Sequence, residues 1–145
     1  MSNDLVQAVN KQVANWTVLY VKLHNYHWYI KGRHFFTLHE KFEELYNEAS
    51  QYIDELAERI LAIEGNPVAT MEECLKVASI KEASGNENEE AMVKSIIQDF
   101  EMMVKELHDG IHVAEKADDE GTADMFIGIM QSLKKHIWMF NAYLG

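Results

Sequence analysis

The amino-acid sequence predicts an all-α protein, a four-helix bundle with one short extra helix in the link between helices two and three. Its length of 145 residues suits one domain, residues 1–145, with a single core. The hydrophobic fraction of 48% argues against disorder, and one proline with seven glycines favours long helices over strands and turns. Apolar residues also recur with helical spacing along four long segments, which pack most readily as a bundle.

The first helix is expected from about Asp4 to Tyr29, and the Lys31-Gly32-Arg33 run then breaks it. Apolar residues of helical period mark the face that it should bury: Leu5, Val9, Val13, Trp16, Leu19, Tyr20 and Leu23. All three tryptophans, Trp16, Trp28 and Trp138, are interpreted as packing residues.

The second helix is expected to start at Thr37, because Thr37-Leu38-His39-Glu40 has the form of a capping box. In that motif the Thr37 hydroxyl accepts from the amide of Glu40, and the Glu40 side chain reaches back. The helix should end at Gly65, since Asn66-Pro67 behind it is a stop signal.

A second capping box, Thr70-Met71-Glu72-Glu73, predicts a short helix to about Val77. The polar run 84–88 indicates a loop before a third long helix at about 89–116. After a turn at 118–121, Thr122 is expected to cap the fourth helix, which runs to Leu144. The short helix indicates that the link between the second and third long helices crosses the bundle.

The formal net charge of −11 argues against nucleic acid as a partner, because affinity for phosphates comes largely from Lys and Arg. The charge would attract cations, although solubility alone is a sufficient explanation. Cys74 is the single cysteine and cannot form an internal disulfide, which fits a reducing, cytoplasmic setting. No apolar run reaches transmembrane length, and Met1 to Asn10 lacks the features of a signal peptide, so no membrane partner is expected.

Two pairs of residues on the second helix are the strongest chemical signal: His39 with Glu43, and Asp54 with Glu58. Each pair is spaced i, i+4, and the four positions fall within about 100° around the helix axis. His39 and Glu58 are nevertheless roughly 28 Å apart along that axis, so one metal ion cannot contact both ends. If the pairs serve one site, two copies of the chain must bring them together, as a twofold axis does.

His27, near the end of the first helix, is the fifth candidate ligand. An oxygen-rich set with imidazoles and no thiolate suits Fe(II) or Mn(II) better than a structural zinc. The alternative for the carboxylates is a solvated, charged helix face. No Glu-x-x-His motif occurs in the sequence, which argues against a di-iron site inside one bundle and leaves a site between bundles open.

Other features are weaker. His108 and His112 are also spaced i, i+4 and are interpreted as a surface pair, although they could hold zinc. Trp28 directly follows His27, so a role as an electron donor is possible. Acidic residues gather around the expected turn at 118–121: Glu115, Asp118, Asp119, Glu120 and Asp124. The simplest interpretation is a hydrated loop with a favourable charge at a helix N-terminus, and the alternative is a funnel for cations.

Several segments resemble the Dps family, the ferritin-like mini-cages of bacteria: Leu23–Trp28, Phe35–Phe42, Asp54–Arg59 and His136–Phe140. The resemblance covers nearly the whole chain. The spacing of the five candidate ligands fits the inter-subunit ferroxidase site of that family: His27, His39, Glu43, Asp54 and Glu58. The family often has aspartate where Glu43 stands, and a carboxylate is kept here.

The resemblance implies a ferritin-like homododecamer with 23 symmetry, a di-iron site at each interface, and a cavity for ferric mineral. It implies an iron-storage ferroxidase that oxidises Fe(II), with hydrogen peroxide as the preferred oxidant, and that limits oxidative stress. It also implies that Glu115, Glu120 and Asp124 line an iron-entry pore.

Some members of the family bind DNA through lysine-rich terminal extensions. Here Met1 to Asp4 precede the first helix, no lysine occurs before Lys11, and the sequence stops at Gly145, so DNA binding is not expected. The alternative to the ferroxidase is a non-enzymatic helical bundle that protects DNA or docks on a partner, with structural histidines.

Overall fold

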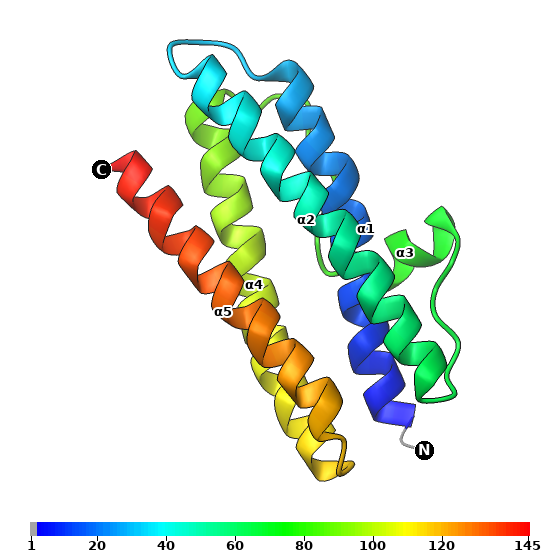
Figure 1. The fold of residues 1–145 in the computed structure, drawn as a ribbon. Helices are drawn as coiled ribbons and strands as arrows, with labels where there is room; N and C mark the ends of the chain where they lie inside the picture. The colour runs from blue at the N-terminus through cyan, green and yellow to red at the C-terminus, as the bar shows by residue number, and fades with distance from the viewer. Residues whose placement is uncertain (1–2) are drawn as a thin grey trace.

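The computed structural model describes residues 3–145, and every regular element in that range is an α-helix (Figure 1). The helices are α1 (Asn3–Tyr29), α2 (Phe35–Ala62), α3 (Met71–Val77), α4 (Glu89–Lys116) and α5 (Glu120–Leu144). The expected all-α class is therefore confirmed, and so is the short extra helix between the second and third long ones.

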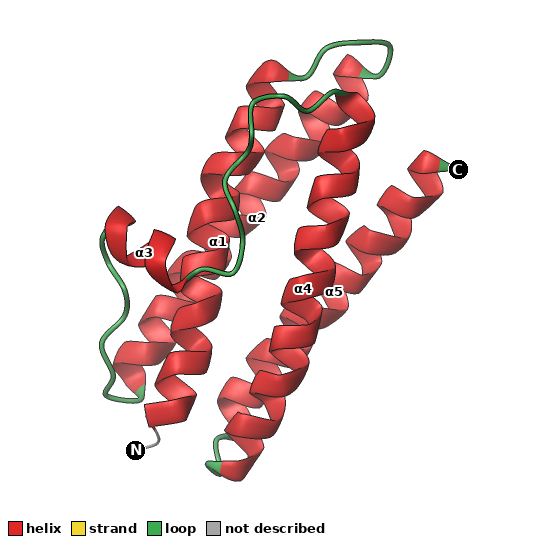
Figure 2. Cartoon of the chain, turned by 180° about the vertical axis from the view of Figure 1, so that it is seen from behind, coloured by secondary structure: helices red, strands yellow, loops and turns green. Residues whose placement is uncertain are grey.

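The four long helices form two antiparallel hairpins, α1 with α2 and α4 with α5 (Figure 1). Residues 63–88 connect the hairpins; this segment carries α3 and then runs back along the bundle (Figure 2). Helices α2 and α4 therefore point in the same direction, as in bundles with one long crossover connection. The expectation that this link crosses the bundle is correct.

Helix α1 anchors the crossover segment through polar side chains. The Lys11 ammonium donates to the carbonyl of Val77 at 2.7 Å, and the amide of Ser79 donates to Oδ1 of Asn15 at 2.8 Å. The Asn15 amide in turn donates to Glu106 of α4 at 2.7 Å. These bonds satisfy backbone groups that would otherwise be partly buried without partners, and they fix where the link lies.

The start of α2 differs from the expectation. The helix begins at Phe35, whose amide donates to the carbonyl of Gly32 at 3.2 Å, and His34 at the N-cap makes no side-chain cap bond. Thr37 therefore lies inside the first turn and is not the cap. Gly32 has φ of 122°, and a Cβ there would lie 2.7 Å from a Glu89 oxygen, so the tight turn that starts the helix early requires glycine.

The end of α2 also comes earlier than Gly65. The helix ends at Ala62, and the amide of Gly65 donates back to the carbonyl of Ile60 at 2.8 Å. Glu64 takes the left-handed conformation with φ of 68°, which makes this end a Schellman motif. Gly65 is needed instead for close packing, because a Cβ there would lie 2.8 Å from a methyl group of Val6.

The capping box of α3 and the bounds of α4 agree with the expectation. The hydroxyl of Thr70 accepts from the amide of Glu73 at 3.1 Å, and the Glu73 carboxylate accepts from the amide of Ala69 at 3.0 Å. The side chain of Asn88, in the expected polar loop, caps α4 by accepting from the amide of Ala91 at 2.9 Å.

The cap of α5 is Asp119, and the prediction of Thr122 is wrong. The Asp119 carboxylate accepts from the amide of Thr122 at 3.0 Å and from its hydroxyl at 2.6 Å. Arg59 of α2 donates to both residues, at 2.7 Å to Asp119 and at 3.0 Å to Thr122. Thr122 is consequently buried in the first turn, and this network ties α2 to the α4–α5 turn.

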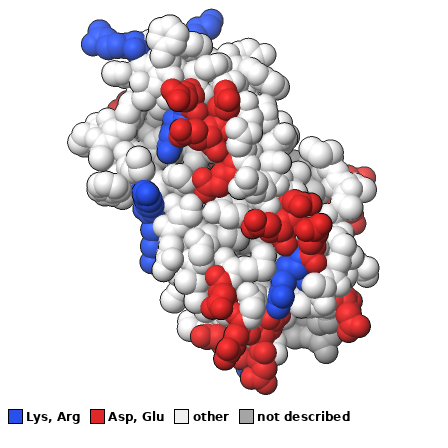
Figure 3. Space-filling view, viewed as in Figure 1, with Lys and Arg blue, Asp and Glu red and all other residues white. Residues whose placement is uncertain are grey.

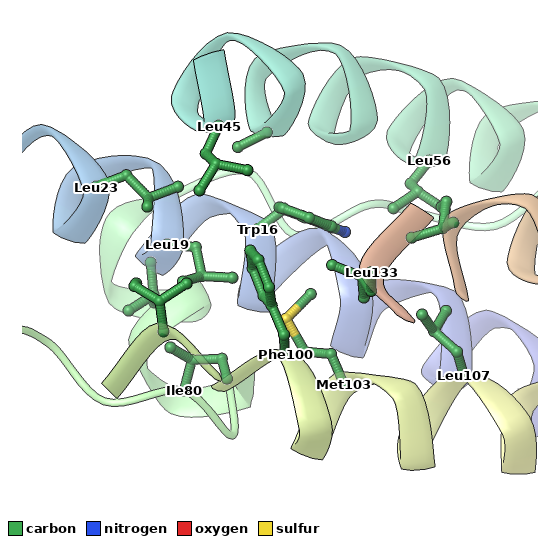
Figure 4. Packing of buried hydrophobic residues seen from close by; sticks show 14 of the residues in the cluster. Trp16, Leu19, Leu23, Leu45, Leu56, Ile80, Phe100, Met103, Leu107 and Leu133 are labelled. Atoms are coloured by element: carbon green, nitrogen blue, oxygen red, sulfur yellow. The ribbon is translucent and has the colours of Figure 1, made fainter. Parts of the chain in front are cut away.

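The core lies where the four long helices meet (Figure 4). Trp16 of α1 stands between Leu45 and Leu56 of α2 and Phe100 and Met103 of α4. It is 1% exposed, which confirms its packing role. The rest of the expected α1 stripe is buried as well, with the exception of Tyr20 at 36% exposure.

Candidate metal centre

His27 and His39 hold each other through reciprocal hydrogen bonds. Nδ1 of each ring lies 2.7 Å from the backbone carbonyl oxygen of the other residue. Because a carbonyl oxygen only accepts, each Nδ1 carries a hydrogen and donates it. In a neutral imidazole this leaves the Nε2 lone pair free, and Nε2 is one of the two nitrogens that histidine offers a metal.

The hairpin of α1 and α2 brings these two histidines together. His27 lies in the last turn of α1 and His39 in the second turn of α2, with only residues 30–34 between the helices. The two rings stack with centroids 3.7 Å apart and planes inclined by 14°. Phe35 stacks on the His39 ring at 4.8 Å. His27 is 7% exposed, so its ring orientation is fixed by packing as well as by hydrogen bonding.

Glu43, one turn after His39, completes a local group of three candidate ligands. Its Oε1 lies 4.0 Å from Nε2 of His27, and its side chain is 52% exposed. The carboxylate is thus on the side of the ring that carries the free lone pair. Two imidazoles and one carboxylate are the donor composition of many non-haem Fe(II) sites.

Asp54 and Glu58 lie away from this group, near the other end of α2. Both are exposed, and Asp54 is eleven positions beyond Glu43, roughly 16 Å along a helix. Acidic side chains accordingly form separate groups along the face of the molecule that α2 occupies (Figure 3). Within residues 3–145, no three His, Cys, Asp or Glu side chains of one chain are arranged to hold a metal ion. The structure places His27, His39 and Glu43 near one another without a complete site in one chain, and it leaves Asp54 and Glu58 apart.

Tyr46 belongs to this region, and the interpretation of the sequence missed it. Its ring lies 5.3 Å from that of His27 in an edge-to-face contact and stacks on His24 at 3.6 Å. Burial raises the pKa of the Tyr46 hydroxyl, and the negative charge of Glu43 adds to that effect. The available signal was its position, three residues after Glu43 and so on the same helical face.

Two tryptophans are not packing residues within the chain. Trp28 is 65% exposed and Trp138 is 67% exposed, so that part of the expectation is wrong. The Trp28 ring lies 5.2 Å from the ring of His24, which itself stacks on Tyr46. Trp28 is therefore linked to the histidine group through aromatic contacts, and its proposed role as an electron donor stays a prediction.

The acidic residues of the α4–α5 turn surround a pocket. A cavity of about 400 Å³ is lined by Glu115, Asp118, Glu120, Ala123, Asp124 and Ile127. The three residues expected at an iron-entry pore are thus neighbours in one chain.

Asp119 is not part of this pocket, because it caps α5 and pairs with Arg59 at 2.7 Å. Burial alone would raise the pKa of Asp119, but hydrogen bonds from Thr122 and the Arg59 guanidinium lower it overall.

The four-helix bundle with its one long crossover defines a protein of the ferritin-like class. A family model described as a ferritin-like domain matches residues 6–145. The chain is 62% identical over 145 residues to general stress protein 20U of Bacillus subtilis, covering 100% of both chains. It is 56% identical to DNA protection during starvation protein 2 of Bacillus anthracis, covering 100% of this chain and 99% of that one.

Solved structures give the same result. Dps from Staphylococcus aureus superposes with a TM-score of 0.98 at 56% identity, covering 99% of this chain and 97% of that chain. The chain therefore belongs to the Dps family. Dps from Vibrio cholerae, described as a ferritin-like diiron-carboxylate protein, matches with a TM-score of 0.94 at 35% identity over 98% of this chain and 89% of that one.

Family membership supports iron binding and a general role in iron storage and stress protection. A helix both long and apolar enough to cross a bilayer does not occur among the described residues.

Proposed function

We propose that the protein is a ferroxidase and iron store, in which two Fe(II) ions bind between subunits, are oxidised, and collect as Fe(III) mineral. The observation that carries the proposal is the reciprocal bonding of His27 and His39, which prepares two imidazole Nε2 atoms beside Glu43. Metal sites commonly fix their histidines in this way, by a hydrogen bond from the other ring nitrogen.

The site is proposed to be shared between two chains. His27, His39 and Glu43 of one chain would face Asp54 and Glu58 of a twofold-related copy, giving two equivalent sites per dimer. The separation of the two ligand groups along α2 supports this arrangement, since one chain cannot supply all five ligands to one centre. Six such dimers would make the homododecameric shell with 23 symmetry, placed in the cytoplasm.

The proposed chemistry balances with hydrogen peroxide as oxidant. Two Fe(II) ions each give one electron, the O–O bond of one peroxide breaks, and two water molecules complete two FeO(OH) units with release of four protons. Sharing two electrons between two irons avoids release of a hydroxyl radical. His27 and His39 would bind through nitrogen, while the three carboxylates would balance the positive charge of the ions.

The acidic pocket is proposed as the entry route. Glu115, Glu120 and Asp124, repeated around a threefold axis, would concentrate Fe(II) before it reaches the oxidation sites. This part of the proposal depends on the assembled shell, because such a pore forms only where three chains meet.

Complementation between two inactive variants tests the shared site. One variant carries His27→Ala with His39→Ala, and the other carries Asp54→Asn with Glu58→Gln. In a dimer of one chain of each variant, one site has lost both ligand groups and the other site is intact. Random co-assembly makes about half of the dimers mixed, so about a quarter of all sites are intact. Fe(II) oxidation followed by absorbance should be absent in each variant alone and return in the mixed shells.

The control for complementation is a mixture of the first variant with Glu55→Gln, an exposed carboxylate beside Asp54 that is outside the proposed site. In that mixture the Glu55→Gln chains supply intact ligands of both kinds, so about half of the sites are complete and activity exceeds that of the test mixture. Wild-type rates in both parent variants, or no recovery on mixing, would contradict the shared site.

Names of relatives that refer to DNA protection favour the alternative of a non-enzymatic protective bundle. Anaerobic Fe(II) titration separates the two functions. Binding should saturate near two ions per interfacial site in the ferroxidase, and no stoichiometric binding should occur in the alternative.

A further inference from the structure

We propose that His108 and His112 form a metal site distinct from the interfacial iron centre, which binds a late first-row divalent ion, Cu²⁺ or Zn²⁺. The two residues lie on α4, near the end of the bundle where the acidic pocket opens. The site requires neither the ferroxidase function nor a second chain.

The geometry of the histidine pair fits a chelate. A spacing of i, i+4 places both side chains on one helical face, about one turn apart. Their ring centroids are 5.0 Å apart, with the planes at 86°. Both residues are exposed, so the rings are free to turn toward a shared ion without displacing core side chains.

Glu115 gives the pair an orienting partner. The Oε1 atom of Glu115 lies 3.4 Å from Nδ1 of His112, which is three residues earlier on the same helical face. A carboxylate at Nδ1 favours the tautomer in which Nε2 is the ligand, and it raises the basicity of the ring. Glu115 also lines the acidic pocket, so the same carboxylate joins the histidine pair to that pocket.

The donor set determines the class of ion. No third His, Cys, Asp or Glu of the described chain completes a preformed site with the pair, so water fills the remaining coordination positions. Two imidazoles bind Cu²⁺ most strongly in the divalent series, Zn²⁺ less strongly and Fe²⁺ more weakly still. The pair would therefore retain copper or zinc at the edge of the pocket while leaving Fe(II) largely unbound.

Cu²⁺ binding to the assembled protein tests the proposal, followed by electron paramagnetic resonance and by the copper retained per chain. All proteins compared carry His27→Ala/His39→Ala, so that the interfacial imidazoles bind no copper. In this background His108→Ala/His112→Ala should lose one Cu²⁺ per chain together with the signal of two coupled nitrogens. Glu115→Gln should keep the two-nitrogen signal and bind about tenfold more weakly, as expected for loss of an orienting partner. Cu²⁺ should in turn displace Zn²⁺ from the pair, because imidazoles bind Cu²⁺ more strongly.

His34→Ala is the matched control. His34 is also exposed and lies 3.8 Å from a carboxylate, Glu89, but Leu38 stands four residues further on in place of a second histidine. Its loss should leave the copper count unchanged. The conservative variant His108→Asn/His112→Asn repeats the main test should the alanine variant fail to assemble. An unchanged copper count in either double variant, or an equal loss in His34→Ala, would overturn the site.

Discussion

The ammonium of Lys22 lies 2.7 Å from Oδ2 of Asp99 inside the bundle, where the two side chains are 5% and 12% exposed. Lys22 also donates to the carbonyl of Lys81 at 3.0 Å, so one buried charge joins α1, α4 and the crossover segment. Burial raises the pKa of Asp99 despite the lowering effect of Lys22. The pair therefore fixes the position of the link, and its desolvation limits how much it adds to stability.

Removing one partner of this pair should be strongly destabilising. We expect Lys22→Met to lower the free energy of unfolding by about 3–5 kcal/mol, because it leaves the Asp99 charge buried and unpaired. The double variant Lys22→Met/Asp99→Leu should recover most of that loss, since it removes both charges. Urea unfolding of the three proteins measures the difference, and equal losses in the single and double variants would contradict the argument.

The same variant should respond to pH in a predictable direction. Without Lys22, the folded-state pKa of Asp99 rises further above its usual 3.8, because burial is no longer opposed. The folded state then binds a proton more tightly than the unfolded state, so Lys22→Met should regain stability relative to wild type as the pH falls toward the acid range. Unfolding at a series of pH values checks the sign.

Substitutions at His39 should separate its structural role from its role as a ligand. His39→Asn keeps a donor near the position of Nδ1 and can still bond to the carbonyl of His27, whereas His39→Ala cannot. We expect a loss of about 1–3 kcal/mol in His39→Ala and less in His39→Asn. Both should slow Fe(II) oxidation by more than about tenfold, because both remove Nε2. Thermal melting and stopped-flow absorbance measure the two effects, and a normal oxidation rate in His39→Asn would exclude His39 as a ligand.

Neutralising the acidic pocket should slow iron uptake. Glu120→Gln with Asp124→Asn should lower the rate of mineral formation while leaving assembly intact. The effect should shrink at high salt, because the Debye length falls from about 10 Å at 0.1 M to about 3 Å at 1 M. Glu101→Gln with Asp109→Asn removes the same charge from exposed α4 positions outside the pocket and is the control. Equal rates in the two double variants would show that the pocket is only a hydrated turn.

Direct binding to DNA should be weak. A chain with a net charge of −11 offers few phosphate contacts relative to its repulsion of the duplex. Gel-shift experiments at low salt and neutral pH, without added metal, should show little or no retention of plasmid. Strong retention that declines as salt rises would favour the DNA-protecting alternative.

The helices follow from the sequence alone, and of the three predicted N-caps the one at Thr70 is correct. Apolar periodicity and the capping box at Thr70 are local patterns, so they identify α1 to α5 without knowledge of the fold. The predicted N-caps at Thr37 and Thr122 are wrong, because the turn at Gly32 and the cap at Asp119 start α2 and α5 earlier in the sequence. In the second case the Asp119 cap is also held by Arg59, which is 60 residues away from Asp119 in the chain.

The candidate site also has a part that the sequence determined and a part that only the tertiary structure decided. Helical spacing by itself determined that His39 and Glu43 share a face of α2, and that Asp54 and Glu58 are too distant to join them in one chain. Only the tertiary structure decided that His27 and His39 bond to each other's backbone, and that Tyr46 lies against them. The physical reason is that periodicity fixes directions within one helix, whereas contacts between helices depend on how their side chains interlock when the hairpin closes.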